Sequence, residues 1–287
     1  FDKNAGWAGL NSLRKQMAAR HYPVLLHMNA SIRANLVSAV IPAQRRIGFD
    51  RKRAREFQWA FSNERIAEQN PARRHVLDGL FQFAEHLGVM ERTMRWDIPV
   101  TPADTQFATE IVSGSGPVCV ISPCSSQRAR NYRNWNVDNF VMLAERLQNK
   151  YAAQVILTGA ATKIEKHYGD AILARTQGVT NLIGATTLKQ LFAVISAADL
   201  VICPDSGPAH MATAAGTRIV GLYSSSNPER TGPYNDMELT VNKYAEAVQK
   251  EFGKTVREVR FGQRVRNPQA MDLITVADVM NKVAIAL

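Results

Sequence analysis

The stretch VICPDSGPAHMATAAGTRIVGLY, residues 201–223, changes character twice within a short span. An apolar run ends at Pro204, a polar turn leads into a series of small residues, and a second apolar run ends at Tyr223. Short apolar runs bounded by turn residues are typical of buried strands, and the segment between them has room for a short helix. We therefore interpret the stretch as strand, helix, strand, which is the repeating unit of an open parallel sheet.

The same alternation continues on both sides of this stretch. Apolar runs predict strands over residues 118–123, 153–159, 181–184, 199–204, 218–223 and 237–242. Helical spacing predicts helices over residues 137–151, 162–176, 188–198, 210–215 and 275–287. Strands that alternate with helices in this way favour a parallel sheet covered by helices on both faces.

A second, less regular α/β set precedes a segment rich in proline and glycine at residues 97–117. Its predicted elements are a helix at 10–20, a strand at 23–29, a helix at 31–41, a strand at 45–50 and a helix at 75–87. We interpret the segment as a linker between two parallel-sheet domains, so the fold class is α/β. The predicted domains cover residues 1–112 and 117–274, and the final helix at 275–287 is expected to pack back on the first domain.

Length and composition agree with two globular domains. The chain has 287 residues, of which 46% are hydrophobic and 21% charged, and ~150 residues per domain is a usual size. No apolar run approaches the ~18–20 residues of a membrane span, and no secretory leader opens the chain. The three cysteines have neither a disulfide framework nor the paired spacing of a zinc site. We expect a cytoplasmic protein.

The chain is strongly basic, with a formal net charge of +10, and a field of this sign attracts polyanions. Basic residues cluster at 45–55 and again at 128–133. Either cluster could simply be a solvated face. A nucleic-acid partner is not expected, because aromatic residues make up only 8% of the chain and no recognition motif interleaves them with the basic loops.

Ligands of open parallel sheets bind beyond the carboxyl ends of the strands, so the loops that follow the strands are the candidate sites. The loop SPCSSQRARNYRNW follows the strand at 118–122 and offers Ser125, Ser126 and Arg133. Hydroxyl groups and guanidinium forks suit phosphate oxygens. The alternative is an ordinary solvated basic loop.

Two further loops have a similar character. After residues 154–158, Gly159 lets a ligand approach the backbone, and Glu165 could accept hydrogen bonds from a ribose; the alternative is an ordinary turn. After residues 199–203, the loop holds Asp205, Ser206, Gly207 and His210. There, a helix start would present N–H groups and a positive dipole end to an anion; the alternative is a capped helix with a structural histidine.

Several common sites are excluded by their motifs. The sequence has no G-x-G-x-x-G, no G-x-x-x-x-G-K-[ST] and no G-x-S-x-G, which disfavours Rossmann redox enzymes, P-loop NTPases and α/β-hydrolases. The acidic residues lack the spacing of a metal site. We therefore expect arginine and a helix dipole, with no metal and no cofactor, to neutralise a bound phosphate.

These residues resemble a known family. The order SPCSS…NYRNW, LTGAAT, and NLIGATTLKQLFAVISAADLVICPDSGPAHMATAAGTRIVGLYSSSNPERTGPY is similar to that of the bacterial heptosyltransferases, the ADP-heptose:lipopolysaccharide enzymes of glycosyltransferase family 9. The Asp-Ser-Gly-Pro-x-His-x-x-x-Ala-x-Gly block is the most specific part. The earlier HMNASIRANLVSAVIPAQRRIGFD also resembles the family, and the similarity spans roughly residues 10–245.

The resemblance implies a GT-B fold, in which two Rossmann-like domains face a cleft. The C-terminal domain would bind the nucleotide-sugar donor, ADP-heptose, and the N-terminal domain a Kdo-bearing lipid A core intermediate. The reaction would be inverting and metal-independent, at the cytoplasmic face of the inner membrane.

The family's residue roles carry over to matching positions. Arg133 would be catalytic and stabilise the leaving diphosphate. The donor-binding residues would be Ser125, Ser126, Gly159, Glu165, Asp205, Ser206, Gly207 and His210. The basic segment with Arg51, Lys52 and Arg53 fits the acceptor side.

One departure stands out. Family members begin with a strand and a loop containing Gly-Asp that supplies the catalytic base, and this chain shows no such segment, so the base has no candidate. Three alternatives stay open: another nucleotide-sugar transferase of GT-B fold, a non-enzymatic polyanion-binding protein, and an inactive fragment that still binds nucleotide. The sugar, the glycosylated core position and the oligomeric state are not fixed by the sequence.

Overall fold

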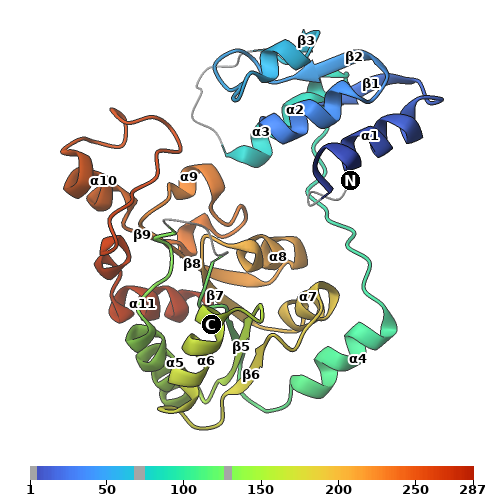
Figure 1. The fold of residues 1–287 in the computed structure, drawn as a ribbon. Coiled ribbons are helices and arrows are strands. Elements are labelled where there is room, and N and C mark those ends of the chain that lie inside the picture. The colour runs from blue at the N-terminus through green and yellow to red at the C-terminus, as the bar shows by residue number, and fades with distance from the viewer. Residues whose placement is uncertain (1–4, 68–74, 126–130) are drawn as a thin grey trace. The chain divides into compact units, whose positions relative to one another are not determined.

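The computed structural model describes residues 5–67, 75–125 and 131–287 (Figure 1). The chain divides into two compact units, Phe1–Thr93 and Met94–Leu287. Each unit contains one parallel sheet and its own helices, and each is described here by itself.

The first unit contains a three-stranded parallel sheet with the order β1-β2-β3. Its strands are β1 (Tyr22–Leu26), β2 (Ala43–Gly48) and β3 (Glu64–Arg65), and its helices are α1 (Gly6–Met17), α2 (Ile32–Ala39), η2 (Gln58–Phe61) and α3 (Val76–His86). The small core joins Ile47, Ile66 and Phe83. Phe49 adds an edge-to-face contact with Phe83, at 5.0 Å between ring centroids, a favoured aromatic geometry.

The second unit contains a six-stranded parallel sheet with the order β6-β5-β4-β7-β8-β9. The strands are β4 (Val118–Ile121), β5 (Gln154–Gly159), β6 (Thr180–Ile183), β7 (Leu200–Pro204), β8 (Arg218–Tyr223) and β9 (Val241–Asn242). This is the doubly wound order, in which the chain runs outward from β4 to one edge and then outward from β7 to the other. The direction of winding therefore reverses between β4 and β7, and ligands of such sheets bind there.

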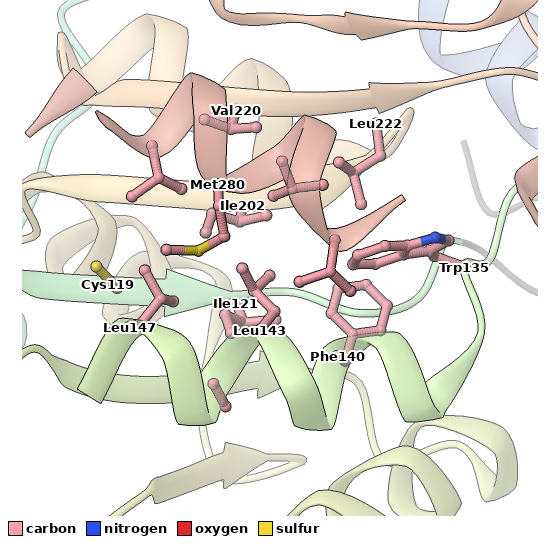
Figure 2. Packing of buried hydrophobic residues seen from close by; sticks show 14 of the residues in the cluster. Cys119, Ile121, Trp135, Phe140, Leu143, Leu147, Ile202, Val220, Leu222 and Met280 are labelled. Carbon is pink, nitrogen blue, oxygen red and sulfur yellow. The ribbon is translucent and has the colours of Figure 1, made fainter. Parts of the chain in front are cut away.

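Helices cover both faces of this sheet because its strands alternate apolar side chains between two cores (Figure 1). One core, drawn in Figure 2, joins the strands to α5 (Val137–Tyr151), α6 (Lys163–Leu173) and α11 (Val276–Ala286). The other joins them to α4 (Pro102–Ile111), α7 (Leu188–Ser196) and α8 (Gly207–Ala215). Each fully buried leucine or isoleucine contributes roughly 1.5–3 kcal/mol, so these two cores stabilise the packing of the strands against the helices.

Most predicted elements of the second unit are confirmed, and α5 has the predicted bounds. Residues 237–242 are only partly a strand, because Met237–Leu239 form the 3₁₀ turn η3 and β9 has two residues. The sequence did not predict α9 (Pro228–Thr231), α10 (Tyr244–Phe252) or the 3₁₀ turn η4 (Ala270–Leu273).

Two segments near the predicted domain boundaries have clear places in the second unit. Helix α4 lies inside the segment predicted as a linker, and its Phe107 and Ile111 pack against the core that contains α7. The C-terminal helix α11, expected to return to the first domain, buries Val276, Val279 and Val283 in the core beside α5. No described helix combines the length and the apolar composition needed to cross a bilayer.

Candidate functional site

The loops after β4 and β7 meet where the winding of the sheet reverses. Arg133 follows β4, and its Nη1 donates to the main-chain oxygen of Asp205, which follows β7, at 2.8 Å. The same nitrogen lies 3.6 Å from Oδ2 of Asp205. The structure thus brings together the predicted catalytic arginine and the predicted donor-binding aspartate.

A chain of side-chain hydrogen bonds holds Arg133 from the other side. Its Nε donates to Oδ1 of Asn131 at 3.0 Å, and Nδ2 of Asn131 donates to Oγ of Ser125 at 2.7 Å. Ser125 in turn donates from its main-chain N and its Oγ to Oδ1 of Asn134. Ser125 therefore belongs to the same polar cluster as Arg133, while Ser126 lies outside the described residues.

Trp135 anchors this loop in the core. It is fully buried, its Nε1 donates to the main-chain oxygen of Ile274 at 2.9 Å, and its ring meets Phe140 edge-to-face (Figure 2). Its own main-chain oxygen accepts from the Tyr168 hydroxyl at 2.7 Å. Because these contacts fix the residue two positions after Arg133, the guanidinium is held by packing as well as by hydrogen bonds.

Helix α8 begins at Gly207, two residues after Asp205. Ser206 occupies the N-cap position in an extended conformation, but its side chain makes no capping hydrogen bond, which speaks against the alternative of an ordinary capped helix. Its Oγ is buried and, apart from the weakly hydrogen-bonding Cys203 thiol, has no partner. The first N–H groups of a helix lack partners within the helix. The start of α8 therefore offers donors and a positive dipole end to an anion.

The remaining residues of this turn leave that end accessible. Gly207 and His210 are exposed, and a Cβ built on Gly207 would meet no atom within 4 Å. The glycine thus leaves open space in front of the helix. His210 lies in the first turn of α8 and is exposed; the helix begins at Gly207, three residues before the predicted start at 210.

Charge in the site centres on Asp205, which is buried and paired with two arginines. Besides Arg133, Nη1 of Arg264 donates to Oδ2 of Asp205 at 2.9 Å. Burial raises the pKa of the neighbouring Cys203 thiol to about 12, and the Asp205 charge adds to this rise. Burial also raises the pKa of Tyr223 well above its usual value. The two neighbours stay protonated at neutral pH, so the cluster has one more positive charge than negative.

Unpartnered polar atoms gather in the loops after β7 and β8. In the described part of the chain, buried side-chain atoms without a hydrogen-bond partner include Oγ of Ser225 and Nδ2 of Asn227, and Oγ of Ser206 has only the weak contact with the Cys203 thiol. Buried polar groups nearly always have partners, so these three atoms mark the strand ends as a place where a ligand would supply missing hydrogen bonds. Ser225 and Asn227 were missed by the sequence analysis, although they directly follow a predicted strand.

Arg264 was also missed, and for a different reason. It lies between α10 and η4, in a segment without a predicted element. The only sequence signal is a local excess of arginine in RFGQRVRNP, residues 260–268, which says nothing about the strand ends that the segment reaches.

Glu165 and Gly159 have a local structural role in the loop after β5. The Glu165 carboxylate accepts from the main-chain N of Ala160 at 2.9 Å and from the Thr162 hydroxyl, and its own N–H donates to Thr162. A Cβ on Gly159 would lie 3.0 Å from Oε1 of Glu165, so glycine gives this carboxylate room. Their donor-binding role remains a prediction.

In the first unit, the three predicted acceptor residues differ in their surroundings. Arg51 and Lys52 are exposed, whereas Arg53 pairs with Asp50 and donates to Gln82. The Arg53 guanidinium therefore ties the end of β2 to α3. Their acceptor-binding role remains a prediction.

The described residues contain no group of three or more His, Cys, Asp or Glu side chains that could hold a metal ion. Positive charge in the candidate site comes from the two arginines and from the start of α8.

Comparison with solved structures identifies the fold. A glycosyl transferase family 9 protein from Veillonella parvula matches with a TM-score of 0.75 at 17% identity, over 100% of this chain and 80% of that one. The Escherichia coli heptosyltransferase WaaC with ADP matches with a TM-score of 0.70 at 16% identity, over 100% and 79%. The chain thus has the GT-B fold of these glycosyltransferases.

Sequence comparison identifies the family. The profile of glycosyltransferase family 9 (heptosyltransferase) matches residues 10–260. The lipopolysaccharide core heptosyltransferase OpsX of Haemophilus influenzae is 38% identical over 98% of this chain and 80% of its own length. Lipopolysaccharide heptosyltransferase 2 of Salmonella typhimurium is 34% identical over 35% of this chain and 30% of its own length. The chain belongs to glycosyltransferase family 9 and is a glycosyltransferase, as its sequence motifs indicated.

Proposed function

We propose that this protein transfers heptose from ADP-heptose to the Kdo/heptose inner core of lipopolysaccharide, with inversion at the anomeric carbon and without a metal ion. The observation that carries the proposal is the meeting of Arg133 and Asp205 beside the start of α8. It supplies a cationic group and a helix dipole where a doubly wound sheet binds its nucleotide. The names of the relatives support the choice of sugar and acceptor.

In the proposed reaction, an acceptor hydroxyl attacks the anomeric carbon from the face opposite the diphosphate. The bond from that carbon to the diphosphate oxygen breaks, ADP leaves with the electron pair, and the hydroxyl proton goes to a general base. Negative charge grows on the diphosphate as the bond breaks. Groups already aimed at that charge stabilise the transition state most, and Arg133 is held in this way by Asn131 and Asp205.

The other residues bind the donor. Gly207 leaves space for the diphosphate in front of α8, and Ser125, Ser126, Ser206 and His210 offer hydrogen-bond groups to it. The unpartnered Oγ of Ser225 and Nδ2 of Asn227 join this set. Glu165 and Gly159 lie on the β5 side, where the ribose would bind.

The proposed acceptor site is supported by the basic residues of the loop after β2. Exposed Arg51 and Lys52 would attract the phosphates and carboxylates of the acceptor, and Arg53 would hold their loop in place. Basic residues near an anionic bilayer contribute about 1 kcal/mol each. We therefore place the enzyme at the cytoplasmic face of the inner membrane.

A donor panel tests the reaction. The protein is incubated with a Kdo–lipid A acceptor and either ADP-heptose, UDP-sugars or GDP-sugars, and nucleotide release is measured. We expect release from ADP-heptose alone. Nucleotide release from another donor would overturn heptose transfer and indicate that the enzyme transfers a different sugar. DNA binding without any ADP binding would favour a polyanion-binding protein.

Arg133→Ala tests the mechanism. Removing one preorganised donor to a developing charge typically lowers kcat by roughly 100-fold, and we expect a smaller change in the KM for the donor. Steady-state kinetics measures both. Arg146→Ala is the matched control, because Arg146 is an exposed arginine of α5. An unchanged kcat for the Arg133 variant would remove this residue from the mechanism.

A further inference from the structure

Arg264 approaches the site from a part of the chain beyond the residues that match the family profile, which end at 260. It nevertheless makes the shorter of the two guanidinium contacts with the Asp205 carboxylate. Its Nη1 lies 2.9 Å from Oδ2, whereas Nη1 of Arg133 lies 3.6 Å from that atom and donates to the main-chain oxygen. Arg264 is therefore the principal partner of this carboxylate.

The backbone on both sides of Arg264 is fixed. The main-chain oxygen of Gln263 accepts from the Tyr244 hydroxyl at 2.7 Å, and the N–H of the buried Val265 donates to the main-chain oxygen of Ser225 at 3.1 Å. Gly262 has φ +82°, and a Cβ there would lie 2.6 Å from the Arg230 side chain. These contacts hold the segment against the end of β8, so the guanidinium of Arg264 is positioned before any ligand arrives.

The Asp205 carboxylate needs such a partner because its surroundings are poorly solvated. Its side chain is 7% exposed, while that of Arg264 is 41% exposed. Burial and, to a smaller extent, the Asp205 charge raise the pKa of Cys203 and that of Tyr223. Burying a carboxylate without a compensating charge is costly. Without Arg264, the carboxylate would draw the Arg133 guanidinium from the main-chain oxygen toward Oδ2 and cancel more of its charge.

We infer that Arg264 is a positioning residue for donor use, which acts by compensating Asp205 so that Arg133 keeps its place and its charge for the diphosphate. This inference rests on the proposed function of the site. It predicts that a substitution of Arg264 affects donor use only when the Asp205 carboxylate is present. If Arg264 contacted the donor directly, the substitution would have the same effect with or without that carboxylate.

A double-mutant cycle with Arg264→Gln and Asp205→Asn tests this. We expect Arg264→Gln to lower kcat/KM for ADP-heptose about tenfold, within the range of coupling between residues in direct contact. In the Asp205→Asn background the same change should alter kcat/KM by less than about twofold. Arg264→Lys, which keeps the charge, should recover most of the loss. If the loss of kcat/KM in the double variant equals the product of the losses in the two single variants, the inference is overturned.

The control variant is Arg266→Gln, since Arg266 is exposed and contacts Glu251 through its main-chain N–H; it should behave as wild type. If Arg264→Gln does not fold, the Asp205→Asn/Arg264→Gln variant is compared with Asp205→Asn; equal kcat/KM for ADP-heptose supports the inference, and a further loss overturns it. ADP affinity, measured by calorimetry, separates the two proposals. If the wild type binds ADP and turns over, and Arg264→Gln changes neither, the inference about Arg264 is overturned and the proposed function stands. If the wild type binds no ADP, both the inference and the proposed function are overturned.

Discussion

Gly207 shows how a single missing side chain defines the space in front of α8. It is the first residue of the helix, and a Cβ there would touch nothing in the protein. Alanine would therefore fit the folded chain, and its methyl group would fill only the place assigned to the diphosphate.

We expect Gly207→Ala to leave the melting temperature unchanged or slightly raised, because alanine is the better helix former. The affinity for ADP should fall about tenfold, since the methyl group occupies the anion's approach to the N–H groups. Calorimetry and thermal unfolding measure the two effects. Gly216→Ala is a contrasting variant that should lose stability, because Gly216 ends α8 with φ +76°. Undiminished ADP affinity in Gly207→Ala would place the diphosphate elsewhere.

Ion pairs also join elements of the first unit. Glu64 of β3 accepts from Nε and Nη2 of Arg45 in β2, both at 2.8 Å, and contacts Nε2 of His86 in α3 at 2.6 Å. These contacts, the arginine first, lower the pKa of Glu64 from 4.5 to about 2. One carboxylate thus links two strands and a helix.

The sign of the resulting pH dependence follows from this lowered pKa. A carboxyl group with a depressed pKa in the folded state contributes its full stability above the unfolded value of 4.5 and loses it as the pH falls through about 2. Thermal unfolding of wild type and Glu64→Gln should therefore differ at pH 6 and converge toward pH 2. The difference will be modest because the pair is partly exposed. A difference that stays constant over this range would show that Glu64 acts through packing.

The elements of the second unit could largely be predicted from the sequence, because its strands are short apolar runs and its helices carry clear caps. Asn136 before α5 and Thr187 before α7 are examples. The packing of α4 on α7 could not be predicted, since a short amphipathic helix between prolines does not indicate which surface it will cover. Likewise, Arg133 and Asp205 follow predicted strands, but Arg264 reaches the site only through tertiary contacts of Gln263 and Val265.

At the scale of the whole molecule, the net charge of +10 bears on where the enzyme works. We expect binding to vesicles that contain anionic lipid and none to neutral phosphatidylcholine vesicles. Binding should weaken strongly between 0.05 and 0.5 M salt, because screening shortens the reach of surface charges from roughly 14 to 4 Å. Co-sedimentation measures both effects.

Replacing exposed Arg51 and Lys52 by glutamine, with Arg53 kept, should reduce vesicle binding and leave ADP affinity as it is. Changing exposed Arg146 and Lys150 of α5 to glutamine removes the same charge elsewhere and serves as the control. If both double variants lose the same amount of vesicle binding, the attraction to the bilayer comes from the overall charge of the protein. The loop after β2 then has no particular role.

The three cysteines have a practical consequence for following the enzyme at work. Cys119, Cys124 and Cys203 are all buried, and burial raises the pKa of each thiol to about 12. Maleimide dyes react with accessible thiolates, so the native protein offers them almost no target. A cysteine introduced at the exposed Arg266 would then be the only reactive position, and a fluorophore there would report donor arrival at the nearby site in real time.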